Sequence, residues 1–514
     1  MATTFPQLTR ERTSKPLPST LVDGVIAFYI CAFIVVAFVF SSDAFLHWFI
    51  VPLFVCGVLI GTDCVQWLRG RVDILDPLGI VSLLAFHFFF LAPLLHVHWD
   101  AWMGRVIPPE DWRVWLGGMA ILNAAGLVLY RFYMSSRSKS TDSEQQRVTN
   151  RVVWQIDKRK FYPLVTLALI VTGAVQVLLF YRYGGVFGYI GLRDQRLEDG
   201  TSALSGTGWI LMIAEAFPLL ALFAFVVYAK DKSWRRHWLF VILVVGAFFV
   251  LRMLFGGLRG SRSNTIWSML WAVMLLHVWI RPFSKKFILT GLLVLFIFVY
   301  LYGLYKGAGS AAFATLTDLD AQSELAFETG RTLEIVVVGD FGRSDVQAFL
   351  LHQLRTPGSD YQYSWGRTYV GGVALLIPRA IWPDRPPTKL KEGTEIQYGQ
   401  GSYLPGIYAS SRQYGLAGEA MLNFGFYIVP FTFLILAAAL KNVRHWYMTW
   451  GSTDDSRFLL VPLLVNFCFA LLVYDSDNLI FFQIKNGLIP FMIVLLGSSR
   501  TTIEAPAAAE QGTA

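Results

Sequence analysis

Four charged residues stand within otherwise apolar stretches of the sequence. They are Glu215, Arg252, Glu419 and Lys485. A charged side chain at the centre of a bilayer costs roughly 2.5–3.5 kcal/mol on insertion scales, so such residues usually belong to a functional site or pair with one another. With a rise of about 1.5 Å per residue, all four would lie roughly 5–11 Å below the same membrane surface. This common depth predicts a polar cavity at the level of the lipid headgroups. Two buried ion pairs, Arg252 with Glu419 and Glu215 with Lys485, are the alternative.

Arginines recur in the polar connections between the apolar stretches. The connection GGLRGSRSN (Gly256 to Asn264) presents Arg259 and Arg262 where the next apolar stretch begins. The N-terminus of a helix there would add free amide donors and a partial positive charge. Guanidinium groups bind phosphate with two parallel hydrogen bonds, so this connection predicts a pyrophosphate site. Basic side chains that extend to lipid headgroups are the alternative. An earlier connection adds Arg193, Asp194 and Arg196.

The longest polar stretch, residues 306–415, has the composition of a binding loop. Loops longer than about 12–15 residues are uncommon unless they are functional or disordered. Its seven arginines and three lysines face eleven carboxylates, which argues against a polyanion such as nucleic acid, and it is rich in aromatic residues. This mixture is typical of a sugar–phosphate site. Within it, Leu333–Leu354 predicts a helix in the membrane interface that presents Asp340, Arg343 and His352.

Helices that span a membrane must position these residues. Of the 514 residues, 55% are hydrophobic and 15% are charged, whereas soluble domains carry about 25% charged residues. The mean hydropathy is +0.51. A bilayer core requires about 20 apolar residues in a helix. We therefore predict an all-α polytopic membrane protein with twelve transmembrane helices, at residues 21–41, 44–62, 74–97, 112–133, 162–183, 208–229, 237–256, 264–280, 287–305, 416–440, 458–474 and 478–497.

The basic residues predict the orientation of these helices. If the N-terminus is cytoplasmic, the loops on that side hold 23 lysines and arginines and the short loops on the other side hold 5. Cytoplasmic loops of membrane proteins are enriched in these residues. The chain then divides into a cytoplasmic tail (1–20), helices 1–9 (21–305), an outward-facing active loop (306–415), helices 10–12 (416–497) and a disordered cytoplasmic tail (498–514). The basic stretch 135–160 would be a solvated cytoplasmic linker.

Three motifs occur together with this topology. They are LRGSRS (Leu258 to Ser263), GRTYVGGVALLIPRAIWPDRPP (Gly366 to Pro387), and a GE pair at Gly418 that is followed by NFG. With twelve spans and long outward loops, these motifs resemble the Wzy-type O-antigen and exopolysaccharide repeat-unit polymerases, which are relatives of the WaaL-type O-antigen ligases. The resemblance covers roughly residues 20–500.

The resemblance implies a GT-C-type glycosyltransferase in the bacterial inner membrane, with the long loop, partly helical, in the periplasm between helices 9 and 10. Undecaprenyl-pyrophosphate-linked repeat units would be donor and acceptor, and no cofactor would be needed. A chain-length regulator and a flippase would be further partners. The loop arginines on which the family depends correspond here to Arg193, Arg196, Arg259, Arg262, Arg367, Arg379 and Arg412. Arg252 and Arg343 complete the expected set of residues that bind pyrophosphate and glycan.

A carboxylate base is expected to activate the acceptor hydroxyl while the arginines stabilise the leaving pyrophosphate. Glu419 is the first choice for this base, followed by Asp340 and then Asp194. Burial should raise the pKa of Glu419 toward neutrality. Two D-x-D pairs, at 318–320 and 475–477, have the spacing used by metal-dependent glycosyltransferases. Such tripeptides are common by chance, and we expect no metal.

Three other functions remain open at this stage. A ligase would be expected to use a histidine in the long loop, for which His352 is the candidate in this loop. A flippase or other transporter of the lipid-linked glycan would be expected to show two similar halves and charges near the middle of the membrane. A scaffold in an export complex would leave the arginines unexplained. The sequence favours the polymerase over these alternatives.

Overall fold

The computed structural model describes residues 18–104, 106–136, 151–199, 208–232, 237–259, 262–315, 318–358, 361–378, 381–404 and 411–503. Within these ranges the chain is mostly helical, and ten helices are long and apolar enough to cross a membrane. These ten are Leu21–Ser41, Ile50–Leu68, Pro77–His98, Arg113–Ser135, Lys158–Arg182, Gly208–Ala229, Lys285–Ala308, Phe426–Ser452, Ser456–Val473 and Ser476–Leu496. The prediction of a helical, multi-pass membrane protein is confirmed.

The two remaining predicted spans are shorter helices. The first, predicted at 237–256, is α11 (Trp238–Leu254), with 17 residues. At about 1.5 Å per residue such a helix is somewhat shorter than a bilayer core of about 30 Å. The second, predicted at 264–280, is α12 (Arg262–Leu275), which continues into the π-helical turn η5 (Leu276–Ile280).

The chain forms two compact units, which are described separately. Unit 1 comprises residues 1–133, 284–444 and 465–484, and unit 2 comprises residues 134–283, 445–464 and 485–514. Four helices have residues in both units: α5 (Arg113–Ser135), of which only the last two residues belong to unit 2, α20 (Val429–Ser452), α21 (Val461–Val473) and α22 (Ser476–Leu496).

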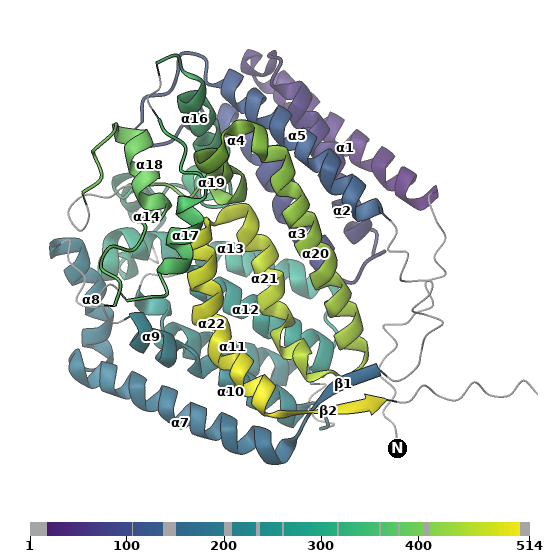
Figure 1. Cartoon of the computed structure of the whole chain (residues 1–514), viewed down its shortest axis with the longest axis vertical. Helices are drawn as coiled ribbons and strands as arrows, with labels where there is room; N and C mark the ends of the chain where they lie inside the picture. Colours follow the sequence, from purple (N-terminus) through teal and green to yellow (C-terminus); the bar gives the residue numbers. More distant parts are fainter. Residues whose placement is uncertain are drawn as a thin grey trace, which may run out of the picture. The chain divides into compact units, whose positions relative to one another are not determined.

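Unit 1 contains the N-terminal helices and the long loop (Figure 1). Its first elements are α1 (Pro18–Ser41), η1 (Asp43–Phe45), α2 (Ile50–Leu68), α3 (Pro77–Phe86), η2 (His87–Leu91), α4 (Ala92–His98) and α5 (Arg113–Ser135). Then follow α13 (Lys285–Ala308), η6 (Gly309–Phe313), α14 (Leu319–Glu328), α15 (Leu333–Ile335), η7 (Val336–Asp340), α16 (Ser344–Arg355), α17 (Arg367–Ala374), α18 (Lys389–Tyr398), α19 (Gly415–Phe424) and η8 (Phe426–Ile428).

The core of unit 1 lies among its first five helices. Phe45, Phe49, Leu53 and Phe90 are fully buried there in one apolar cluster. On the outer side of α1, by contrast, the side chain of Phe40 is 87% exposed. An exposed phenylalanine is unfavourable in water, but in a membrane-spanning helix it faces acyl chains. The exposed apolar side chains of this unit are therefore consistent with a lipid-facing surface.

The long loop differs from its prediction in its interfacial helix. The stretch 333–354, predicted as one interfacial helix, is α15, the π-helical turn η7 and α16, with a break at 341–343. Residues 344–351 of α16 are buried, because α16 packs on α4 and α19.

The tenth predicted span, 416–440, is also divided. Gly425, with φ 83°, separates α19 from η8 and α20, so Glu419 lies on a short helix before the span begins at Phe426.

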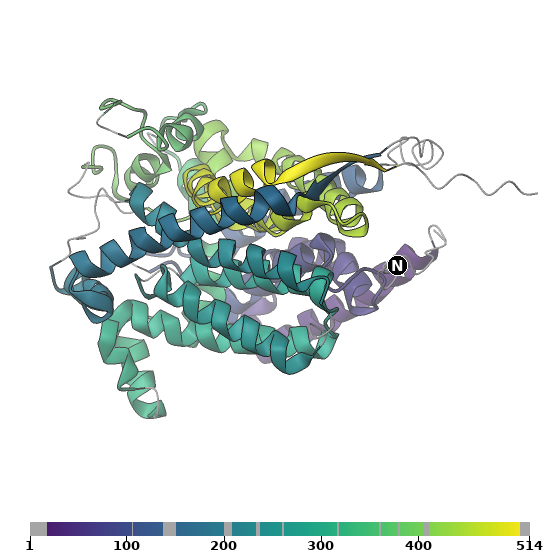
Figure 2. The same cartoon turned by 90° about the horizontal axis from the view of Figure 1, so that it is seen from below.

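Unit 2 contains α7 (Lys158–Arg182), α8 (Gly185–Asp199), α9 (Gly208–Glu215), α10 (Phe217–Ala229), α11, η4 (Gly257–Arg259), α12 and η5, and η9 (Ser456–Leu460). It also contains a two-stranded antiparallel sheet that was not predicted. Strand β1 (Arg151–Ile156) pairs with β2 (Ser498–Ile503), with Arg151 opposite Ile503 and Ile156 opposite Ser498 (Figure 2). These two short strands interrupt an otherwise helical fold. The solvated linker predicted at 151–156 and the disordered tail predicted at 498–503 are therefore wrong. Alternating Val, Trp, Thr and Ile residues supply the strand propensity.

A buried charged cluster joins four elements of unit 2: α9, α11, α12 and the last part of α22. The carboxylate of Glu215, on α9, lies 2.8 Å from Lys485 Nζ and 3.4 Å from Arg252 Nη2. Arg252 also donates to the main-chain oxygens of Glu215 at 2.8 Å and Asn264 at 3.2 Å. Of the two ion pairs that were the alternative to a polar cavity, Glu215 with Lys485 is present. The other, Arg252 with Glu419, is not, because Arg252 pairs with Glu215 instead.

We expect the variant Glu215→Gln to destabilise the protein by about 3–5 kcal/mol, because two buried cations lose their carboxylate. Thermal unfolding of the detergent-solubilised protein measures this loss. The matched control is Lys485→Met, which leaves Glu215 paired with Arg252 and should cost clearly less. Equal losses in the two variants would contradict the structure of this cluster.

Candidate active site

Glu419, the first choice for the catalytic base, is deeply buried. It lies in the middle of α19, and only 1% of its surface is exposed. One carboxylate oxygen, Oε1, accepts hydrogen bonds from Thr368 Oγ1 at 2.7 Å and from Ser476 Oγ at 2.6 Å. The other, Oε2, accepts from the backbone N–H of Ser476 at 2.6 Å. All three donors are neutral groups.

A second buried carboxylate, Asp475, lies next to Ser476 in the turn between α21 and α22. It forms an ion pair with Lys389 of α18, with 2.6 Å between Nζ and Oδ2. Its other oxygen accepts from the backbone N–H of Tyr414 at 2.9 Å. The Lys389 ammonium also donates to the main-chain oxygen of Arg412. Four segments that are distant in the sequence thus meet at two adjacent carboxylates.

Burial, together with the neighbouring Asp475 carboxylate, raises the pKa of Glu419 to about 7, although the donors from Ser476 and Thr368 oppose this shift. Burial also raises the pKa of Asp475, against the effect of the Lys389 ammonium. A carboxyl group with a pKa near neutrality can both accept and release a proton under physiological conditions, as general acid–base catalysis requires. The expectation that the pKa of Glu419 is raised is confirmed.

Asn423 and Thr368 orient the donors around Glu419. The amide nitrogen of Asn423 donates to Thr368 Oγ1 at 2.7 Å and to the main-chain oxygen of Glu419 at 2.8 Å. Because an amide nitrogen only donates, the Thr368 hydroxyl accepts from it and directs its own proton to Glu419. The Asn423 side-chain oxygen accepts from the backbone N–H of Gly366 at 2.9 Å, which ties α19 to the start of α17.

Two predicted arginines border this network. Arg343 donates to the main-chain oxygen of Gly339 and, at 3.1 Å, to the side chain of Gln413, and Arg412 donates to the main-chain oxygen of Gly104. Among the described residues, the Nε atoms of both arginines are buried without a hydrogen-bond partner. Burial lowers the pKa of Arg343, whereas the carboxylates of nearby aspartates, Asp475 among them, raise it. Both guanidinium groups therefore have an N–H donor that no described protein group uses.

Arg367 and Asp340 are farther out in the same unit. The side chain of Arg367 is 46% exposed and pairs with Glu392, which is almost completely buried on α18. Asp340 ends the π-helical turn η7 and lies 3.9 Å from Arg331. Of the two, Arg367 is connected to the network more directly, because Gly366 and Thr368 on either side of it bond to Asn423.

The other predicted site residues are not part of the described network. Arg252 is fully buried in the Glu215 cluster of unit 2. The side chains of five further residues on α8, η4 and α12 lie outside the described residues, as does the whole of Arg379; the five are Arg193, Asp194, Arg196, Arg259 and Arg262. Their participation stays a prediction.

Several residues of the network were missed by sequence reasoning. Asp475 was noted only as part of a D-x-D pair, and Lys389, Thr368 and Ser476 were not singled out. One signal was available: Glu419 and Asn423 are four residues apart, which places them on one face of a helix. No sequence signal brings Lys389 to Asp475, because 85 intervening residues separate a helix from a turn.

The first aspartate of each D-x-D pair has a protein partner. Asp318 caps α14 by accepting from the backbone N–H groups of Asp320 and Ala321, and Asp475 pairs with Lys389. In the part of the chain that the structure describes, no three His, Cys, Asp or Glu residues gather as a metal site would require.

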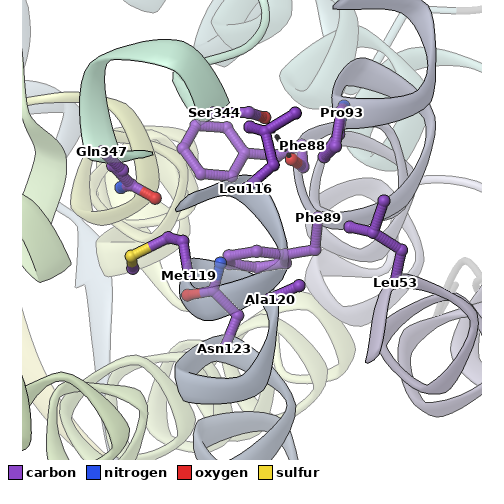
Figure 3. A pocket seen from close by; sticks show the side chains of 10 residues that line it. All are labelled: Leu53, Phe88, Phe89, Pro93, Leu116, Met119, Ala120, Asn123, Ser344 and Gln347. Carbon is purple, nitrogen blue, oxygen red and sulfur yellow. Dashed lines mark hydrogen bonds between the residues drawn. The ribbon is translucent and has the colours of Figure 1, made fainter. Parts of the chain in front are cut away.

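A small cavity in unit 1 lies near this network (Figure 3). It is lined by Leu53, Phe88, Phe89, Pro93, Leu116, Met119, Ala120, Asn123, Ser344 and Gln347. Gln347 connects its wall to the network, because its amide donates to the main-chain oxygen of Tyr414 at 3.1 Å. Most of the lining is apolar, so the cavity is unsuited to a phosphate or a sugar.

The pKa of Glu419 predicts a pH-dependent stability. Its folded-state pKa of about 7 exceeds the ordinary value of 4.5, so the folded state binds the proton more tightly than the unfolded state does. This stabilisation is complete below pH 4.5 and is lost as the pH rises through 7; at 1.36 kcal/mol per pKa unit it amounts to about 3 kcal/mol.

We therefore expect the unfolding temperature of the wild type to fall more steeply between pH 5 and pH 8 than that of Glu419→Gln, which cannot titrate. Thermal unfolding in detergent over this pH range measures both. Asp320→Asn, at an exposed carboxylate, is the matched control and should follow the wild type. Parallel curves for the wild type and Glu419→Gln would show that this carboxyl group has an ordinary pKa.

Comparisons with known proteins give no relative for this chain. No family model matches it, and no curated protein or solved structure is similar to it.

Proposed function

We propose that this protein is a membrane glycosyltransferase that polymerises undecaprenyl-pyrophosphate-linked repeat units of an O-antigen or exopolysaccharide. The observation that carries this proposal is the buried Glu419, whose pKa is about 7, held beside the Lys389–Asp475 ion pair and bordered by Arg343 and Arg412. The resemblance of the sequence motifs supports the substrate class. The distribution of lysine and arginine supports a location of this site on the periplasmic side of the bacterial inner membrane.

In the proposed reaction, an acceptor hydroxyl oxygen forms a bond to the anomeric carbon of the donor glycan. The bond between that carbon and the pyrophosphate oxygen breaks, and its electron pair leaves with undecaprenyl pyrophosphate. Arginine side chains such as Arg412 compensate the charge that develops on this leaving group. The proton of the acceptor hydroxyl passes to the carboxylate of Glu419.

Because Glu419 is buried, we infer that the proton reaches it through a hydroxyl group. Ser476 is the better candidate, since it is partly accessible to solvent whereas Thr368 is completely buried. Ser476 Oγ lies 2.6 Å from Glu419 Oε1, so it can pass its proton to the carboxylate while it takes one from the acceptor. Ser476 thereby acts as a relay and Glu419 as the base.

His352 supports the polymerase over the ligase. Its ring stands edge-on to the indole of Trp115, with 4.9 Å between the ring centroids. It contributes no described hydrogen bond to the network around Glu419; its bonding partner is the hydroxyl of Thr356, one turn along α16. A histidine held in this way is suited to packing between helices.

The central test is elongation by the purified protein in lipid nanodiscs supplied with lipid-linked repeat units. We expect the wild type to produce a ladder of lengthened products and Glu419→Gln to be slower by roughly 10²–10⁴-fold, the usual contribution of a general base. Because the base must be deprotonated, kcat/KM of the wild type should rise with pH and level off above about 7. Asp320→Asn should match the wild type.

Other outcomes would replace the proposal. Movement of the lipid-linked glycan across the membrane without lengthening would indicate a flippase. In a deletion strain, surface glycan reduced to one repeat unit supports a polymerase, whereas long chains not attached to their final carrier would indicate a ligase. A Glu419→Gln variant that elongates normally would remove the assigned base.

The pyrophosphate role of the arginines is tested by charge-conserving changes. Arg412→Lys and Arg262→Lys should each reduce elongation by about 10²-fold or more, because lysine cannot provide the planar, bidentate donor pair. Yields of folded protein should stay normal. The matched control is Arg355→Lys, at an arginine whose guanidinium lies over the ring of Phe426. Full activity in both Arg412→Lys and Arg262→Lys would exclude the pyrophosphate role.

A further inference from the structure

Residues 365–378 and 381–382 present several exposed apolar side chains. The exposed fractions are 76% for Trp365, 53% for Val370, 56% for Val373 and 75% for Ile381. The sequence between residues 368 and 378, TYVGGVALLIP, contains no charged residue. Water-soluble surfaces rarely gather large apolar side chains in this way, so the surface is expected to meet a partner of low polarity.

The opposite side of α17 is closely packed, so these side chains cannot turn inward. A Cβ atom at Gly371 would collide with the main-chain oxygen of Pro387, and one at Gly372 would lie 3.0 Å from Ser476 Oγ. Thr368 and Ala374 on the same side are buried. The glycines, Thr368 and Ala374 of α17 thus face the protein, and its valines face outward.

The backbone holds Trp365 in an outward position. Its φ is +47°, in the left-handed region that a bulky side chain rarely adopts. The N–H groups of residues 364–366 donate in turn to Leu422 O, Asn423 O and Asn423 Oδ1, at 3.1, 3.1 and 2.9 Å. These three bonds terminate α19 and fix the strained turn.

The exposed surface is continuous with the side of α20 that is exposed within a predicted membrane span. The ring of Trp365 lies 6.3 Å from that of Phe424, and Phe424 ends α19 two residues before the span begins at Phe426. Just inside the span, the side chains of Tyr427 and Phe431 are also exposed. Tryptophan and tyrosine are enriched where a transmembrane helix meets the interface.

We propose that residues 365–378 and 381–382 lie in the membrane interface, with Val370, Val373 and Ile381 in contact with phospholipid acyl chains. This part of the long loop then lies in the bilayer surface, whereas the sequence predicts an interfacial position only for the stretch 333–354 of this loop. Ser476, directly behind Gly372, is brought to the level of the headgroups. The inference concerns the position of the segment, and it holds or fails independently of the proposed reaction.

The experiment places single cysteines on the segment and measures their contact with lipid. Val373→Cys and Ile381→Cys are labelled with a polarity-sensitive fluorophore and reconstituted in phosphatidylcholine–phosphatidylglycerol nanodiscs. The four native cysteines are buried. Any fluorescence from label attached to them is measured on the wild type and subtracted. Ser323→Cys, on the exposed polar side of α14, is the matched control. Quenching by nitroxide lipids is compared with quenching by aqueous iodide.

We expect both labels to be quenched by nitroxide lipids and protected from iodide, with the strongest quenching from nitroxides roughly 5–10 Å below the headgroups. The Ser323 label should show the reverse. If the two labels are quenched by iodide like the control, the surface faces water or a glycan and the inference fails. If neither quencher acts, protein covers the surface and the inference also fails. Val370→Cys repeats the measurement, so that one poorly folded variant does not decide it.

Discussion

The ion pair between Lys389 and Asp475 is the interaction on which the candidate site depends. The side chains of the two residues are 6% and 0% exposed, and a buried carboxylate that loses its cation is strongly destabilising. Asp475 also accepts from the backbone of Tyr414, so it joins α18, the residues before α19 and the turn between α21 and α22. Since Ser476 follows Asp475, this junction also sets the position of the hydroxyl and amide groups that bind Glu419.

The two carboxylates have different partners, and this difference separates their roles. Asp475 has an ammonium group within ion-pair distance, whereas the described donors to Glu419 are two hydroxyl groups and one amide. The charge of Asp475 is therefore tied to the structure of the site, while the charge of Glu419 can change with pH at a smaller structural cost. Pairs of carboxyl groups in unequal environments are a common way to provide one structural anion and one proton acceptor.

Much of the fold follows from hydropathy alone, because a bilayer core requires about 20 apolar residues per helix. That rule located every long helix, and it drew attention to Glu419 and Glu215 as charges in apolar surroundings. It could not divide α19 from α20, because the break at Gly425 depends on a left-handed backbone and not on polarity. It also could not assign Arg252 to Glu215, since partners among buried charges depend on how helices pack. The strands β1 and β2 were missed because their pairing joins stretches more than 300 residues apart.

The segment around α17 shows how one short sequence can satisfy two requirements. Thr368 must reach Glu419, and Gly371 and Gly372 must let the helix approach Pro387 and Ser476. These residues occupy one side of the helix, because positions three and four apart share a face. The remaining positions are then directed away from the protein, where Val370 and Val373 are found. Polar residues at positions 370 and 373 would leave the contacts to Glu419 intact. They would, however, make this face of α17 prefer water to lipid. The apolar side chains therefore have a role that the network behind them does not require, which is to hold the site at the membrane surface.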